Sequence, residues 1–404
     1  MIYEVVIIGG GAAGFFAAIN LSLAGEKVLI LEKSNKVLSK VKVSGGGRCN
    51  VTHACFEPRE LAANYPRGEK ELLGPFHRFY TSDTIEWFAE RGIELKIEED
   101  GRMFPITDSS QTIIDCFIKE QEEKGIKLWK QAEVVKVEKE GLFKITLKDG
   151  QLIESKRLVT ATGGGNKAKH YDFIEALGHH VLSPIPSLFT FNLKGHASNA
   201  LMGISHEATV HLKGTNFEAS GPVLFTHWGM SGPAILKLSA QAAAFLHQKH
   251  YEFDYAVCWL PNAQRFINEH RKVSAAQSVL STKPTDFTKR FWLYLLERAK
   301  IEQEKNWADL TAYEMELLKA VLEEDIYHAK GKTTFKEEFV SCGGVDLKEI
   351  NPKTMESKLL SGLYFCGEVM NVDALTGGFN FQAAWTTAWL VAQKINQELV
   401  EAKV

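Results

Sequence analysis

The chain has 404 residues, 45% of them hydrophobic, which is enough for more than one sizeable core and excludes a disordered or fibrous protein. Its 47 lysines and arginines nearly balance 50 acids and are scattered rather than gathered into a run, so we expect a small-molecule partner and no nucleic acid. Six cysteines without a CxxC pair predict reduced thiols in a cytoplasmic protein, with no disulfide framework and no metal site.

The first apolar segment, from Tyr3 to Leu23, carries glycines through its middle and lacks a basic start, so we interpret it as part of the fold rather than as a signal peptide. Residues Tyr3–Ile8 predict a buried parallel strand, Gly9–Gly14 (GGGAAG) a tight turn, and Phe15–Ala24 a helix. No other stretch reaches the ~20 apolar residues of a membrane span, and we expect no membrane association.

This glycine turn has the features of a dinucleotide-binding motif. Gly9 permits the turn, Gly11 lets the backbone approach a pyrophosphate, and Gly14 allows the helix to pack on the strand. A second predicted strand, Lys27–Leu31, ends at Glu32, where a carboxylate can accept hydrogen bonds from ribose hydroxyls. A glycine turn with a purely structural role is the alternative.

Three further glycine-rich segments offer backbone to a ligand. Ser44–Asn50 (SGGGRCN) predicts a loop that approaches a ligand closely, and Ala161–Gly165 (ATGGG) follows a predicted strand. Near the end, a short strand runs into Gly367–Glu368, and Gly377–Asn380 precedes an alanine-rich helix expected over 383–398. The start of that helix is a second place where backbone N–H groups can face a ligand.

In this order, and nearly from end to end, these segments resemble the family of two-domain FAD proteins that includes aminoacetone oxidase and the 3-dehydro-bile-acid-reductase-like NAD(P)/FAD-dependent oxidoreductases. The resemblance implies that the first motif holds the ADP half of FAD and that the later ones line the pyrophosphate, ribityl chain and flavin. The implied cofactor-binding residues are Gly9, Gly11, Ala12, Ala13, Gly14, Glu32, Lys33, Ser44, Gly45, Gly46, Gly47, Arg48, Cys49, Asn50, Ala161, Thr162, Gly163, Gly367, Glu368, Asp373, Gly377, Gly378, Phe379, Asn380 and Gln382.

The middle of the chain predicts an insertion. Residues 188–260 alternate short β-like runs with Gly, Ser and Asn, which is typical of a barrel or sandwich, and 331–339 would return from it. Between 261 and 330, apolar residues recur at helical spacing. We therefore predict an α/β fold: a glutathione-reductase-like Rossmann FAD domain (1–187 and 340–404), an inserted β-rich, barrel-like substrate domain and a small helical subdomain, with the substrate bound where the insert meets the flavin.

Candidate catalytic residues are few, because a flavin itself carries out hydride and electron transfer. His227 is a candidate proton donor or acceptor, although such a histidine more often only hydrogen-bonds a turn. Arg48 is a candidate for stabilising negative charge on a ligand; a loop-to-strand hydrogen bond is its alternative. A redox dithiol formed by Cys49 and Cys55 is a weaker hypothesis, because five residues separate them where disulfide reductases have four.

We expect an FAD-dependent oxidoreductase that transfers a hydride between flavin and a small organic substrate, with NAD(P)H left open as a transient electron donor. ATGGG lacks a following acid at the right distance, so a dedicated nicotinamide domain is not expected. The alternatives are an oxygen-dependent amine oxidase of the aminoacetone type that releases peroxide, a flavin-binding RNA-modification or partner protein, and a protein that binds a nicotinamide nucleotide alone. Substrate and oligomeric state stay unknown.

Overall fold

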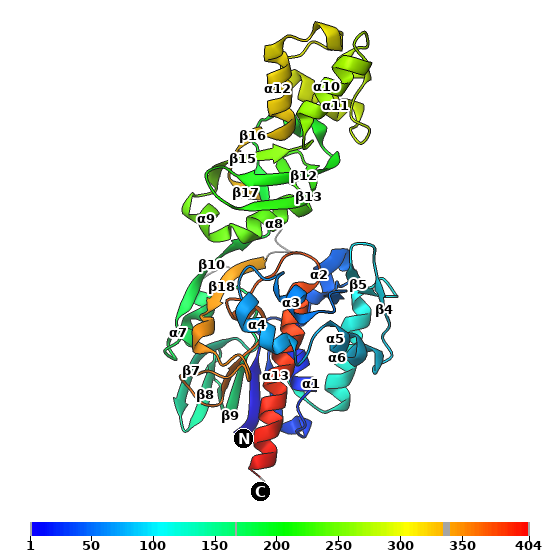
Figure 1. Cartoon of the computed structure of the whole chain (residues 1–404). Helices are drawn as coiled ribbons and strands as arrows, with labels where there is room; N and C mark the ends of the chain where they lie inside the picture. Colours follow the sequence, from blue (N-terminus) through cyan, green and yellow to red (C-terminus); the bar gives the residue numbers. More distant parts are fainter. Residues whose placement is uncertain (1, 166–167, 334–339, 403–404) are drawn as a thin grey trace. The chain divides into compact units, whose positions relative to one another are not determined.

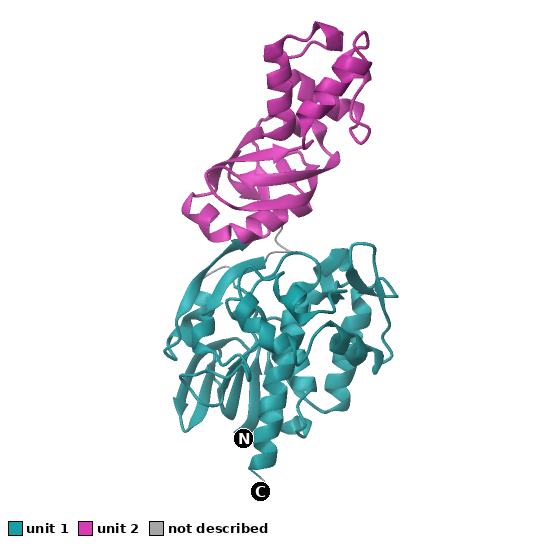
Figure 2. Ribbon diagram, viewed as in Figure 1, with its two compact units in different colours: residues 1–186, 336–404 teal, residues 187–335 magenta. Residues whose placement is uncertain are grey.

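The computed structural model describes residues 2–165, 168–333 and 340–402, and the chain divides into two compact units. Unit 1 comprises Met1–Pro186 and Lys336–Val404, and unit 2 comprises Ser187–Phe335 (Figure 2). The predicted helical subdomain falls within unit 2, and most of the predicted return segment, 334–339, lies outside the described residues. The two units are described separately below.

Unit 1 is built on a sheet whose parallel part follows from its runs of buried β-branched residues. The strand order is β6-β2-β1-β9-β8-β7, and β19 continues alongside the second half of β9. β6, β2, β1, β9 and β19 pair in parallel, whereas β7 and β8 form an antiparallel extension. The bounds are β1 Ile2–Ile8, β2 Val28–Leu31, β6 Lys127–Trp129, β7 Val134–Glu140, β8 Leu142–Leu147, β9 Leu152–Thr160 and β19 Leu363–Phe365.

Helices cover this sheet and two small sheets flank it (Figure 1). The helices of unit 1 are α1 Ala12–Ile19, α2 Ser39–Gly47, α3 Pro58–Ala62, α4 Glu69–Phe76, α5 Thr81–Ala89, α6 Ser110–Glu123, α7 Asp172–Glu175 and α13 Phe379–Glu401. The small sheets are β3-β5-β4 (Thr52–His53, Arg102–Pro105, Leu95–Ile97) and β10-β18 (Val181–Ser187, Val340–Val345). α13 begins four residues earlier than predicted because Gly378, with φ +94°, takes the cap position.

An aromatic cluster fixes α1, α5, α6 and α13 against one another. The ring centroid of Phe16 lies 4.6 Å from that of Trp87 and 5.2 Å from that of Trp385. Phe117 from α6 completes the cluster at 5.6 Å from Trp385. All four rings are buried. The helix that follows the first glycine turn is thereby held against the C-terminal helix, so the two glycine-rich segments that precede these helices are brought to the same region of unit 1.

Unit 2 contains a seven-stranded antiparallel sheet in the order β16-β15-β12-β13-β14-β11-β17. Its two ends approach each other, since β11 contacts β16, which gives the barrel-like form predicted for the insert. α10, α11 and α12 lie together at one end of this sheet and α8 and α9 at the other (Figure 1). The bounds are β11 Thr190–Asn192, β12 Ser205–Leu212, β13 Glu218–Phe225, β14 Gly229–Ser231, β15 Glu252–Cys258, β16 Asp325–Lys330, β17 Lys332–Thr333, α8 Pro233–Gln241, α9 Ala243–Gln248, α10 Ala263–Val273, α11 Lys289–Arg298 and α12 Ala312–Glu323.

The predicted α/β class with an inserted β-rich module is confirmed by this architecture. Within the described part of the chain, no helix combines the length and hydropathy needed to cross a membrane.

Candidate functional site

The first glycine turn is shaped by close backbone contacts on one side and by open space on the other. A Cβ on Gly9 would lie 2.2 Å from the carbonyl oxygen of Ala161, and one on Gly14 would lie 2.0 Å from that of Gly9. Gly11, by contrast, has no described atom within 4 Å of an added Cβ. The turn therefore packs tightly against the ATGGG segment and leaves its middle glycine facing free space at the start of α1, where a pyrophosphate can approach.

Glu32 lies beside this turn, at the end of β2. Its Oε2 accepts a 2.9 Å hydrogen bond from the amide of Gly10, and its Oε1 accepts one of 2.9 Å from Ser34. Each carboxylate oxygen keeps a second lone pair, so the group can still accept from the hydroxyls of a ribose. Lys33, the next residue, is exposed. The positions of Glu32 and the turn fit the adenosine half of a dinucleotide.

The SGGGRCN loop, like the first glycine turn, has glycines whose backbone borders open space. Ser44 leaves the helical conformation, and the three glycines after it have positive φ values. No described atom lies within 4 Å of a Cβ built on Gly46 or Gly47, whereas one on Gly45 would lie 2.7 Å from the ring of Phe104. Two of the three glycines therefore face space that a ligand can occupy.

The side chain of Arg48 is held by contacts with other residues of the chain. Its guanidinium pairs with Glu98 and lies 3.9 Å from the centroid of the Phe104 ring, with Asp108 at 3.5 Å. The hydrogen bond to Glu98 raises the pKa of Arg48. The side chain therefore braces the loop against β4 and β5, as the alternative interpretation held, and a direct ligand contact by Arg48 stays a prediction.

The next residue, Cys49, is fully buried, and burial raises the pKa of its thiol to about 12. Because the thiolate is the reactive form of cysteine, the structure argues against the redox dithiol of Cys49 and Cys55.

The C-terminal segments meet the first motif and the SGGGRCN loop. A Cβ on Gly367 would lie 2.9 Å from the Cβ of Ala13. Glu368 pairs with Lys40 of α2 and lies 3.5 Å from the amide of Gly164. Glu368 therefore lies between α2 and the ATGGG turn. In the sequence, only the family resemblance had indicated that these segments form one site.

The start of α13 is tied to the SGGGRCN loop by Asn50. The side-chain oxygen of Asn50 accepts from the amide of Gly378 (3.0 Å), and its nitrogen donates to the carbonyl of Thr52 (2.9 Å). Asn380 closes the preceding loop, since its Oδ1 accepts from the amide of Ala374 at 3.0 Å. Together with Gly377, these residues hold the glycine-rich helix start beside the loop.

Two predicted cofactor residues form contacts within the protein core. Asp373 and Gln382 both have fully buried side chains. Asp373 forms an ion pair with Arg67. The Oε1 of Gln382 accepts from the hydroxyls of Thr52 (2.6 Å) and Thr84 (3.0 Å). Both side chains are therefore turned into the core, where they brace the surrounding elements, and a contact of either residue with the cofactor stays a prediction.

Two more residues lie among these segments: His53, which sequence reasoning did not single out as a site residue, and Thr162, a predicted cofactor residue. The Nδ1 of His53 is 3.0 Å from the carbonyl oxygen of Gly377, and its ring stacks on Phe379 with the centroids 4.5 Å apart. The hydroxyl oxygen of Thr162 is buried, and no hydrogen-bond partner for it exists among the described residues. A buried hydroxyl without a partner is unusual, and a bound ligand would supply one. Its position beside Gly163, whose added Cβ would also meet no described atom, fits a bound dinucleotide.

His227 belongs to unit 2 and lies at the exposed tip of the turn that joins β13 to β14. The amide of Thr226 donates to the carbonyl of Gly229 at 2.8 Å, and the Thr226 hydroxyl donates to the same oxygen at 2.9 Å. The turn is therefore closed by Thr226, and the imidazole of His227 is left for contact with other groups.

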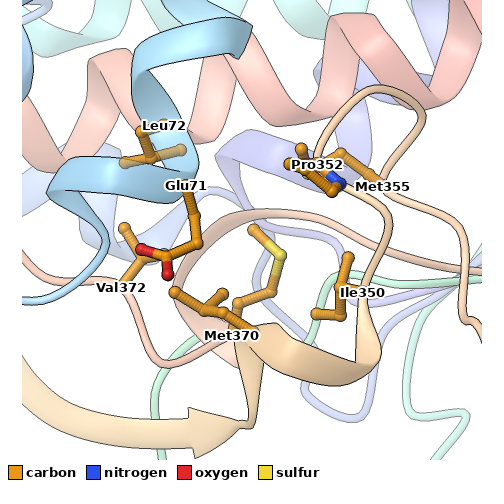
Figure 3. A pocket seen from close by; sticks show the side chains of 8 residues that line it. Glu71, Leu72, Ile350, Pro352, Met355, Met370 and Val372 are labelled. Atoms are coloured by element: carbon orange, nitrogen blue, oxygen red, sulfur yellow. The ribbon is translucent and has the colours of Figure 1, made fainter.

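One small hollow in unit 1 is lined by none of the predicted site residues (Figure 3). It has a volume of about 10 Å³, at the lower limit for a single water. Its lining residues are Glu71, Leu72, Leu347, Ile350, Pro352, Met355, Met370 and Val372. We interpret it as a packing gap in unit 1.

The parallel sheet, the glycine turn with its carboxylate, and the three glycine segments gathered beside them define an FAD-dependent oxidoreductase with a Rossmann-type domain. The chain belongs to the family described as HI0933-like protein Rossmann domain, which matches residues 3–394. The predicted FAD family and enzyme class are thereby confirmed.

Curated relatives extend over the whole chain. It is 32% identical over 416 residues to the ribosomal RNA dihydrouridine synthase of Escherichia coli, covering 99% of both proteins. It is 31% identical over 410 residues to the protein of the same name in Haemophilus influenzae, covering 98% of this chain and 99% of that one. It is 26% identical over 405 residues to the 3-dehydro-bile acid delta(4,6)-reductase of Clostridium scindens, covering 96% and 97%.

These relatives overturn one expectation. We predicted no nucleic-acid partner from a net charge near balance, but two full-length relatives above 30% identity carry a name that refers to ribosomal RNA. The inference was wrong because a whole-chain charge is an average, and a local basic surface can exist in a protein with a net charge of -3.

Proposed function

We propose that this protein is an FAD-dependent dihydrouridine synthase that acts on ribosomal RNA. The observation that carries the proposal is the full-length identity of 32% and 31% to two proteins of that name, together with the open space beside Gly11, Gly46 and Gly47 that a dinucleotide can occupy. The reaction adds two hydrogens across the C5–C6 double bond of a uridine: a hydride to one carbon and a proton to the other. The uracil is reduced and the electron donor is oxidised.

The relatives' names favour a reductase over an oxidase. Saturation of uracil and reduction of a 3-dehydro bile acid both concern a carbon–carbon double bond conjugated to a carbonyl group. Such a bond accepts a hydride because the carbonyl oxygen stabilises the negative charge that develops, so one site can serve both substrates with changes outside the flavin. This shared chemistry makes the aminoacetone-type oxidase the weaker alternative.

The chain's own residues would hold the cofactor in the following way. Glu32 would accept from the ribose hydroxyls, Gly11 and the start of α1 would face the pyrophosphate, and Gly46, Gly47 and the start of α13 would approach the isoalloxazine end. FAD supplies the hydride chemistry when bound. His227 remains our candidate for the proton that the second carbon requires.

NAD(P)H is the proposed electron donor. It would reach the cofactor as a transient co-substrate, since the sequence offers one strand–glycine–helix–acid unit and the FAD uses it.

The proposal is tested with purified protein and ribosomal RNA from cells that lack this gene. We expect a yellow protein whose visible absorbance is bleached anaerobically by NADH or NADPH, and ribosomal RNA that gains dihydrouridine, measured by mass spectrometry of nucleosides. Rapid bleaching without any dihydrouridine, combined with reduction of a steroid enone, would favour a small-molecule reductase instead. Peroxide release from aminoacetone in air, without bleaching by NAD(P)H, would overturn the reductase assignment.

A further inference from the structure

The helical part of unit 2 divides into two oppositely charged halves. Residues 261–300 contain eight lysines and arginines against three acids, and residues 301–330 contain three lysines against eight acids. The first half comprises α10, α11 and the segment between them, and the second comprises α12 and β16. The whole-chain charge hides this division, because the two halves cancel.

The basic side chains of the first half are exposed and largely free. Arg265, Arg271 and Lys272 on α10, and Lys289 and Lys300 around α11, are all exposed. Within residues 2–165, 168–333 and 340–402, no carboxylate lies within 4.0 Å of any of these five cationic groups. A cation without an intramolecular partner keeps its full attraction for an external anion.

Two other cations in the helical part of unit 2, unlike these five, form ion pairs with acids of the same chain. Arg298 of α11 pairs with the buried Asp325, and Lys305 pairs with Glu314 at 2.7 Å. These pairs serve the packing of the helices. The five free groups have no such structural use in the described chain, which suggests that they face a partner.

The outer face of α10 adds hydrogen-bonding groups to the charge. Gln264, Arg265, Asn268, Glu269, Lys272 and Val273 line a solvent-open hollow on this face. Amide and guanidinium groups donate well to phosphate oxygens and ribose hydroxyls, and Glu269 is the single acid among these residues. The helix beneath is held rigidly, because Phe266 and His270 on its other side pack against Trp307 with ring centroids 5.8 and 5.2 Å apart.

We propose that the exposed cations of α10, Arg265, Arg271 and Lys272, form a basic face that binds the phosphate backbone of the ribosomal RNA substrate. This inference rests on the proposed function and adds to it the surface that binds the RNA. Phosphate contacts fix the position of a nucleic acid without reading its sequence, so the face anchors the RNA while the choice of uridine is made elsewhere.

The test compares three proteins: wild type, the triple variant R265Q/R271Q/K272Q, and the control variant K119Q/K136Q/K148Q. The control removes the same charge from lysines of unit 1 that already pair with acids. Binding of a fluorescent ribosomal RNA fragment is measured by anisotropy at several salt concentrations. FAD absorbance and thermal melting establish that each variant is folded.

We expect the triple variant to lose at least tenfold in RNA affinity and to flatten the slope of log K against log salt by about 2, since each phosphate contact contributes ~0.7 for a single strand. The control should match wild type. Equal binding by all three proteins would overturn this inference and leave the proposed function intact, provided that wild type forms dihydrouridine. A wild-type protein that neither binds ribosomal RNA nor forms dihydrouridine would overturn both. Binding to anionic phosphatidylglycerol vesicles in place of RNA would also overturn the inference.

Discussion

The amide of Gly10 donates a 2.9 Å hydrogen bond to Oε2 of Glu32, joining the first glycine turn to the end of β2. This bond holds the Glu32 carboxylate beside the first glycine turn in the absence of a ligand. Little rearrangement is therefore needed for the carboxylate to accept hydrogen bonds from a ribose. The relationship connects residues 22 positions apart in the chain.

We expect Glu32→Gln to weaken FAD binding about tenfold, because losing a charged acceptor costs ~1.5 kcal/mol or more. The dissociation constant is measured by flavin fluorescence on adding FAD to the apoprotein. Glu123→Gln, at an exposed acid of α6, is the control and should bind FAD as wild type does. An FAD affinity of Glu32→Gln within twofold of wild type would remove Glu32 from the site.

Gly9 and Gly11 should respond differently to alanine. Gly9→Ala places a Cβ 2.2 Å from the carbonyl oxygen of Ala161 at φ +119°, so we expect the apoprotein to lose ~3 kcal/mol or more of unfolding free energy. Gly11 has φ -94° and open space, so Gly11→Ala should leave stability within ~1 kcal/mol and weaken FAD binding at least tenfold. Urea denaturation and FAD titration measure the two effects. Unchanged FAD affinity in Gly11→Ala would mean that no phosphate lies against this glycine.

The first motif could be predicted because its requirements are local: a strand, a close-packed turn, a helix and an acid at fixed spacing. The roles of Asp373 and Gln382 could not, because closeness to a glycine motif in the chain does not reveal which way a side chain points. Gln382 is the fourth residue of α13 and contacts Thr84 of α5, a residue 298 positions away in the chain. The basic residues of α10 were missed for a related reason, since the acids of 301–330 that offset them in the total come later in the chain.

Gln382→Leu distinguishes a role in packing from a role in cofactor binding. Leucine fills similar volume but leaves the hydroxyls of Thr52 and Thr84 without their acceptor, so we expect a loss of ~2–4 kcal/mol in unfolding free energy. The folded fraction should still bind one FAD with unchanged affinity. If the variant melts like wild type and loses FAD, the original assignment to the cofactor was right.

The cysteines should divide into two classes. Cys49, Cys116, Cys342 and Cys366 are buried, and burial raises the pKa of each thiol, to about 12 for Cys49 and about 11 for Cys116 and Cys342. In the native protein at pH 8, we expect Ellman's reagent to react only with the half-buried Cys55 and Cys258, and with all six in denaturant.

The raised pKa of Cys49 makes the free energy of unfolding depend on pH. Because the folded-state pKa of Cys49 lies above its unfolded value, the thiol's contribution to stability is complete below about pH 9 and declines as the pH rises toward 12. Cys49→Ala should therefore reduce this alkaline decline and still form dihydrouridine. A variant that folds and binds FAD yet makes none would restore the dithiol hypothesis.

His227 offers the most direct test of the chemistry. If its imidazole donates the proton to the second uracil carbon, His227→Gln should slow dihydrouridine formation by about 10²-fold, the lower end of general acid catalysis, while NAD(P)H still bleaches the flavin at the wild-type rate. Thr226 and Gly229 close the turn without help from the imidazole, so the variant should fold normally. His77→Gln, at an exposed histidine of unit 1, is the control. Full activity of His227→Gln would assign the proton to another donor, and His53, which stacks on Phe379, would be the next variant to make.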